Sequence, residues 1–232
     1  MQSSEILSQQ IGPSSPSGWL EGVSWIYKLP FAFIFGCLLG LSSPGFDLYA
    51  VAWFGLVPLL VLLRAAQGKI DAAMTGGVFG LGYYLVSLSW YLGLFPLNWL
   101  GLQDWLGIQA AVIVWLVESL HQSLLFAAFA LMLFCLPLRA GALPHFKRPF
   151  FPYLLSVPLL WIFFHWPVAT SELFVGIPVN QLAYSQFHQH DLIQIARLGG
   201  SGLIDFLLVL ANAALAELFI ELSAWAPKIE ER

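Results

Sequence analysis

The sequence predicts an all-α fold, a polytopic bundle of about six transmembrane helices. Of its 232 residues, 59% are hydrophobic and only 9% are charged, whereas charged residues make up about a quarter of a typical soluble domain. The apolar residues also gather in runs close to the ~20 residues that a helix needs to cross ~30 Å of hydrocarbon. These runs are residues 25–41, 48–63, 70–94, 105–138, 150–166 and 202–225.

The breaks between the runs contain turn-forming residues, and they divide the chain into three parts. Residues 1–24 are rich in Ser, Gln, Pro and Gly and lack the basic start of a signal peptide, so we expect a disordered cytoplasmic tail. Residues 25–225 form the membrane domain, and residues 226–232 a short cytoplasmic tail. The run 105–138 is too long for one straight span and too short for two. Its first part, 105–117, is therefore expected to lie at the interface or to dip into the membrane.

The distribution of cations predicts the orientation, because short loops rich in Lys and Arg stay in the cytoplasm. With both termini inside, every Lys and Arg except Arg197 falls on the cytoplasmic side. The net charge is -4 and no basic stripe is present, so nucleic acid is not expected as a partner.

Few side chains suggest chemistry. Cys37 and Cys135 lie inside apolar runs and are interpreted as small core residues. His188, His190 and Asp191 supply two imidazoles without an evident third ligand, which favours a solvated loop over a metal site. No metal, cofactor or catalytic residue is therefore predicted.

Glu118, His121 and Gln122 share one face of a predicted helix. Ionisable groups at membrane depth are often functional. They can equally form a mutually satisfied pair near the outer boundary. The sequence leaves these two interpretations open.

Small residues at four-residue spacing indicate close helix packing. They occur at Gly36 and Gly40, and again at Ala72, Gly76 and Gly80. The Gly-rich stretch 199–202 predicts a hinge before the last helix, with Asp205 in the first turn of that helix.

Three groups of motifs together resemble the N-terminal membrane region of the apolipoprotein N-acyltransferase family, over roughly residues 29–221. The first is Gly40–Pro44 (GLSSP) with Trp53–Leu60 (WFGLVPLL). The second is the span Gly76–Tyr91, which ends in Ser-Trp-Tyr. The third is a series of short steps before the last span: Thr170-Ser171-Glu172, Gly176-Ile177-Pro178, Tyr184-Ser185-Gln186 and Asp205-Phe206-Leu207-Leu208.

The resemblance implies an enzyme of the bacterial inner membrane that moves an acyl chain from a phospholipid to the N-terminal cysteine of a lipoprotein. The family's catalytic Glu, Lys and Cys belong to a nitrilase-like domain that follows a seventh span, and the sequence ends at Arg232. We therefore expect this chain to be inactive alone. Its partners would be membrane phospholipid and either a lipoprotein substrate or a separate nitrilase-like domain.

The resemblance also directs attention to residues 167–186, whose mixture of aromatic and polar side chains predicts the rim of a lipid-facing cleft. The predicted substrate-binding residues are Glu172, Tyr184 and Gln186, together with Trp90 and Tyr91. The alternative is a non-catalytic integral membrane protein that binds lipid or a partner.

Overall fold

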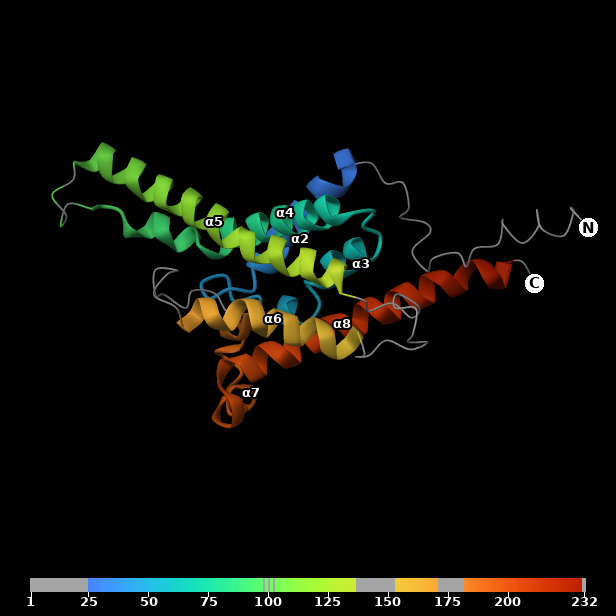
Figure 1. Cartoon of the computed structure of the whole chain (residues 1–232). Helices are drawn as coiled ribbons and strands as arrows, with labels where there is room; N and C mark the ends of the chain where they lie inside the picture. The colour runs from blue at the N-terminus through green and yellow to red at the C-terminus, as the bar shows by residue number, and fades with distance from the viewer. Residues whose placement is uncertain are drawn as a thin grey trace, which may run out of the picture.

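A computed structural model of the chain describes residues 25–97, 99, 101, 103–136, 153–170 and 182–230. Within these ranges the chain forms seven α-helices and three 3-10 helices and no strand, so the predicted all-α class is confirmed (Figure 1). The α-helices are α2 (Trp25–Gly40), α3 (Val57–Arg64), α4 (Lys69–Ser87), α5 (Asp104–Cys135), α6 (Tyr153–Thr170), α7 (His190–Ile193) and α8 (Ala196–Glu230). The 3-10 helices are η2 (Tyr49–Trp53), η3 (Ser89–Leu94) and η6 (Leu182–Gln186).

Three helical segments are long and apolar enough to cross a membrane: Lys69–Leu94, Asp104–Cys135 and Ala196–Ser223. Three shorter apolar segments, Ile26–Gly40, Tyr49–Arg64 and Tyr153–His165, match the remaining predicted runs. Large apolar side chains such as Val117, Leu120 and Leu124 remain exposed along α5, as expected where the solvent is lipid.

α5 is one uninterrupted helix of 32 residues, about 48 Å long at 1.5 Å per residue. Residues 105–117 form the first half of that continuous helix and are not a separate element, while their position at the interface stays a prediction. Figure 1 shows this half extending past the end of α6.

The predicted small-residue stripes are confirmed by the packing of α4 between α2 and α5. A Cβ added at Gly36 of α2 would clash with the backbone carbonyl of Phe79. A Cβ added at Gly76 or Gly80 of α4 would clash with Phe126 of α5. Glycine thus allows the backbones to approach closely, and van der Waals packing holds membrane helices together.

α8 contains the predicted break at its glycines. Gly199 has non-helical angles (φ −151°, ψ 22°), and Gly200 has φ 67°, which favours a residue without a side chain. Beyond the break, α8 lies along α6 and contacts α3.

Aromatic rings join α6 to α5 and α5 to α4. Phe126 of α5 makes edge-to-face contacts with Trp161 of α6 (ring centroids 5.2 Å apart) and with Tyr84 of α4 (5.8 Å). These rings are almost fully buried. Edge-to-face contacts between them stabilise the packing beyond the hydrophobic energy gained by burial.

The bundle has two ends with different side chains. The ion-paired end is where α2, α4 and α6 begin and α3 and α5 end, and it is defined by Lys28, Arg64, Asp71 and Glu217. The aromatic end is where α4 ends and α8 begins, and it is defined by Trp90, Tyr91, Tyr184 and Asp205.

Candidate functional site

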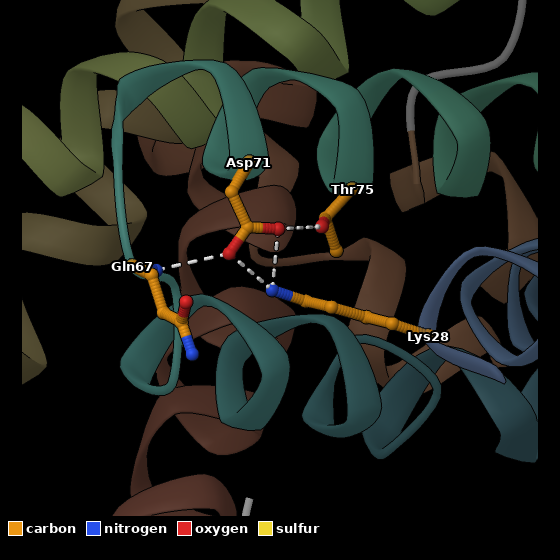
Figure 2. Close-up of polar contacts among 4 residues, drawn as sticks. All are labelled: Lys28, Gln67, Asp71 and Thr75. Atoms are coloured by element: carbon orange, nitrogen blue, oxygen red, sulfur yellow. Dashed lines mark hydrogen bonds and ion pairs between the residues drawn. The ribbon is translucent and has the colours of Figure 1, made fainter. Parts of the chain in front are cut away.

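A buried ion pair between Lys28 and Asp71 lies at the ion-paired end (Figure 2). Lys28 and Asp71 are only 5% and 8% exposed, and Lys28 Nζ lies 2.6 and 2.7 Å from the two carboxylate oxygens of Asp71. The backbone N–H of Gln67 and the hydroxyl of Thr75 also donate to this carboxylate, at 2.9 and 3.4 Å. Every acceptor of Asp71 is therefore engaged within the protein, and the pair links α2 to α4.

A second ion pair lies at the same end of the bundle. The guanidinium of Arg64 donates to Oε1 of Glu217, with Nε at 3.1 Å, and so joins α3 to α8. It also lies 4.0 Å from the ring centre of Tyr153 at the start of α6. This cation–π contact adds a third helix to the assembly.

The buried side-chain amides of Asn212 and Gln186 form hydrogen bonds that fix η6 and the middle of the bundle in place. Asn212 of α8 accepts from the backbone N–H of Leu56 and donates to the carbonyls of Ala52 and Leu208, each at 2.8 Å. Gln186 is fully buried; it donates to the Tyr49 carbonyl (3.0 Å) and accepts from the Trp53 indole (3.3 Å). These bonds connect η6 and α8 to η2.

The aromatic end contains a buried carboxylate of a different kind. Asp205 is 3% exposed, and Oδ1 accepts from the backbone N–H of Ala183 at 2.5 Å. The indole of Trp161 lies beside the carboxylate, although its N–H has no hydrogen-bond partner among the described residues. Asp205 was predicted only as a helix-start charge. Its carboxylate instead anchors the segment before α7.

His165 stacks on Trp161 with ring centroids 4.0 Å apart. Its Nδ1 lies 2.9 Å from the Trp161 carbonyl, which can only accept, so Nδ1 carries the proton of the neutral ring. Nε2 is then a buried acceptor without a partner in the described part of the chain. Buried polar atoms are rarely left unpaired, so this region is a candidate for contact with water or ligand.

The predicted substrate-binding residues differ in exposure and in the elements that carry them. Trp90 and Tyr91 stack on each other in η3 (centroids 4.2 Å apart, interplanar angle 24°), and Trp90 is 45% exposed. Tyr184 is exposed on η6, whereas Gln186 points inward. Glu172 lies outside the described residues. Their role in binding substrate stays a prediction.

An open cavity of about 390 Å³ lies where α6 meets the break in α8. Apolar side chains and glycine backbone line most of it, including Ile162, Leu203 and Phe206. The sequence pointed to the glycines as a hinge, but it contained no sign of a cavity, because the wall is shared with a helix some forty residues earlier.

Cys37 and Cys135 are free thiols on α2 and α5. Within the described ranges, no three His, Cys, Asp or Glu side chains gather as a metal site would require. His188 lies on the surface, with Nε2 3.9 Å from an Asp47 carboxylate oxygen.

Sequence reasoning overlooked Asn212, His165 and the environment of Asp205. A signal was available, since each is a polar residue inside an apolar run, and such residues face the bundle interior. Their partners could not be read from the sequence, because most lie on other helices.

Comparison with known proteins agrees with the motifs. Residues 35–214 match the family model described as the apolipoprotein N-acyltransferase N-terminal domain.

Several relatives, including the following three, carry the name apolipoprotein N-acyltransferase. The Gloeobacter violaceus protein is 32% identical over 182 residues, which cover 78% of this chain and 32% of the relative. The Geobacter metallireducens protein is 31% identical over 199 residues, 84% of this chain and 34% of the relative. The Chromobacterium violaceum protein is 29% identical over 211 residues, 89% of this chain and 36% of the relative.

The chain thus spans about a third of the length of the curated relatives that it matches. The family match itself covers most of the described helices, from α2 into α8. The chain therefore belongs to the apolipoprotein N-acyltransferase N-terminal domain family.

Proposed function

We propose that this chain is the membrane-embedded part of an apolipoprotein N-acyltransferase. In the full enzyme, an acyl chain would pass from a phospholipid to a cysteine thiolate and then to the N-terminal amine of a lipoprotein. The observation that carries the proposal is the family match over residues 35–214 on a bundle of apolar helices. The chain would hold lipid and lipoprotein acyl chains beside a catalytic domain.

The proposed orientation is six crossings of a bacterial inner membrane with both termini in the cytoplasm. It is supported by the position of Lys28, Arg64 and Lys69, which all lie at the ion-paired end. The positive-inside rule would place that end in the cytoplasm. A reporter that works only outside the membrane, fused after Arg232, should be inactive, and full activity would contradict the six-crossing topology.

The substrate would meet the bundle at the aromatic end. Trp90 and Tyr184 are exposed aromatic side chains suited to the membrane interface. The cavity at Ile162, Leu203 and Phe206 offers apolar surface to an acyl chain. Gln186 would act by holding η6 in place, since its amide is engaged with Tyr49 and Trp53.

A chimera tests the proposal. Residues 35–214 would replace the matching region of the Gloeobacter violaceus relative, and transfer of a labelled acyl chain from phospholipid to a lipopeptide would be measured. We expect measurable transfer. The same chimera without the relative's catalytic cysteine is the control for background transfer.

A chimera that inserts into the membrane with a normal melting temperature but transfers no acyl chain would favour the alternative, a non-catalytic membrane protein that binds lipid or a partner.

The isolated chain provides a second test. Neither Cys37 nor Cys135 should form a thioester with labelled phospholipid, because both lie in strongly apolar helices, and His121, on the helix of Cys135, is about 21 Å away along the helix axis.

A further inference from the structure

Two polar side chains of α8 hold two short 3-10 helices against it. Asp205 and Asn212 are seven positions apart on α8 and therefore share one face of the helix. Oδ1 of Asp205 accepts from the backbone N–H of Ala183 in η6 at 2.5 Å. The amide of Asn212 accepts from the N–H of Leu56 and donates to the carbonyl of Ala52 in η2, each at 2.8 Å. α8 thus holds η6 with one residue and η2 with the other.

Gln186 closes this arrangement into a ring, because it joins η6 directly to η2. Its amide donates to the carbonyl of Tyr49 at 3.0 Å and accepts from the indole of Trp53 at 3.3 Å. Gln186 is fully buried and Asp205 is 3% exposed. A hydrogen bond broken at such a site leaves a buried group unpaired, which opposes a partial release of η6. The hydrogen bonds of η6 to η2 and α8 are therefore expected to break together.

The segment that follows η6 is held together by local bonds. Residues 187–198 contain α7, which is only one turn long, and their side chains include Phe187 (42% exposed) and Leu198 (86% exposed). Outside the helices, the backbone hydrogen bonds found for these residues in the described part of the chain all join residues three or four positions apart. The segment is coherent in itself, but its backbone does not tie it to the bundle.

Side chains attach the same segment only lightly. Ile193 and Ile195 are partly buried against the core. His188 adds a surface contact, with Nε2 3.9 Å from an Asp47 carboxylate oxygen, and exposed pairs of this kind contribute little. The firm attachments therefore lie at the two ends of the segment.

The second end is the glycine break in α8. Gly200 has φ 67° and ψ −170°, and a Cβ added there would meet nothing within 4 Å. Rotation at this residue is thus limited neither by a side chain nor by close neighbours. Gly199 and Gly200 also line the open cavity, together with Ile162 and Phe206. A rotation at the two glycines would therefore change the wall of the cavity.

We propose that residues 182–198 form a strap that swings as one unit about Gly199 and Gly200, and that its movement opens and closes the cavity between α6 and α8. Asp205 and Gln186 are the latch that keeps the strap closed. Hinges of this kind are a few residues at the end of an element that absorb the change in backbone angles. The proposal concerns a movement of the chain itself, so it holds whether or not the proposed acyl transfer is correct.

Hydrogen exchange of the full chain in nanodiscs, followed by mass spectrometry, tests whether the strap moves as a unit. The pH is raised until exchange outpaces reclosing, so that each opening is recorded. We expect peptides from residues 182–198 to show two mass populations that interconvert at one common rate, as a cooperative unit requires. A single population whose mass rises gradually would mean independent fraying, and it would overturn the proposal.

Gln186→Met tests the latch, because it keeps a side chain of similar length but removes both bonds to η2. It should make residues 187–198 open about tenfold faster, as expected for the loss of buried hydrogen bonds. Gln194→Met removes an exposed amide from the strap itself and should leave the rate unchanged. Amides of α4 and α5 should stay protected in both variants, which separates an open latch from a lost fold. Equal opening rates in the parent chain and a folded Gln186→Met variant would contradict the latch.

Fluorine NMR tests the link to the cavity. 4-Fluorophenylalanine is placed at position 206 in the cavity wall, and at position 163, where the parent ring is 63% exposed on α6, as the control. In the Gln186→Met background we expect position 206 to give a second signal that exchanges with the first at the rate of strap opening, and position 163 to give one signal. A single signal at position 206, unchanged by Gln186→Met, would show that the cavity does not follow the strap and would overturn the proposal.

Discussion

The carboxylates at the two ends of the bundle have different partners. At the ion-paired end, Asp71 meets Lys28 and Glu217 meets Arg64. At the aromatic end, Asp205 and Glu118 meet amide donors, aromatic rings and the imidazole of His121, and no Lys or Arg of the described segments pairs with them.

The difference indicates two roles for the same kind of residue. A buried carboxylate bound by a cation on another helix ties helices together, and its hydrogen-bonding capacity is used up. A buried carboxylate without such a cation is held by uncharged donors instead, as Asp205 is by the backbone N–H of Ala183. A charge at membrane depth is therefore a marker of function only once its partners are known.

The largest expected effect comes from breaking the Lys28–Asp71 pair. Lys28→Met leaves a carboxylate buried without its cation, which should reduce the free energy of unfolding by about 3–5 kcal/mol. Equilibrium unfolding in mixed detergent micelles measures this. Lys69→Met, at an exposed lysine of the same end, is the control. The double variant Lys28→Met, Asp71→Leu should recover most of the stability, and failure to recover would contradict a role confined to the pair.

A smaller effect is expected at the aromatic end for Asp205→Ala. This change leaves the buried backbone N–H of Ala183 unpaired, a loss of about 1–3 kcal/mol in the same unfolding experiment. Asp205→Asn keeps an oxygen that accepts from Ala183, so it should retain most of the stability. If both variants were equally unstable, the hydrogen bond would not be the cause.

Arg64 should contribute less than Lys28, because its side chain is 23% exposed and that of Glu217 is 28% exposed. We expect Arg64→Ala to reduce the free energy of unfolding by about 1 kcal/mol through loss of a partly screened ion pair and of the contact with Tyr153. High salt should shrink the difference between Arg64→Ala and the parent chain. A difference that does not depend on salt would point to packing instead.

The smallest effect on stability is expected for Glu118→Gln, within about 0.5 kcal/mol of the parent chain. The substituted amide still accepts from Gln122, and no Lys or Arg among the described residues loses a partner. Unfolding in ligand-free micelles tests this. A large loss of stability would place Glu118 with the ion-paired carboxylates and end the contrast between the two ends.

Features that depend on neighbouring residues along the chain could be predicted well. Lipid cannot satisfy backbone groups, so long apolar runs must become helices, and the six runs do so. The glycine spacing on α2 and α4 predicted close approach, and the contact between Glu118 and Gln122 followed from their separation by four residues. The run 105–138 was expected to be divided, but α5 continues without a break from Asp104 to Cys135, because length alone does not show where a helix ends.

The sequence by itself determined the class of the protein, the positions of its apolar helices, and the residues whose polarity is unusual at membrane depth. Only the tertiary structure decided which of those residues are satisfied. Lys28 and Asp71 are 43 positions apart, Ala183 and Asp205 are 22 apart, and Tyr49 and Gln186 are 137 apart. The physical reason is that helical periodicity specifies neighbours three or four residues away, whereas the partner of a buried charge is set by which helices pack together.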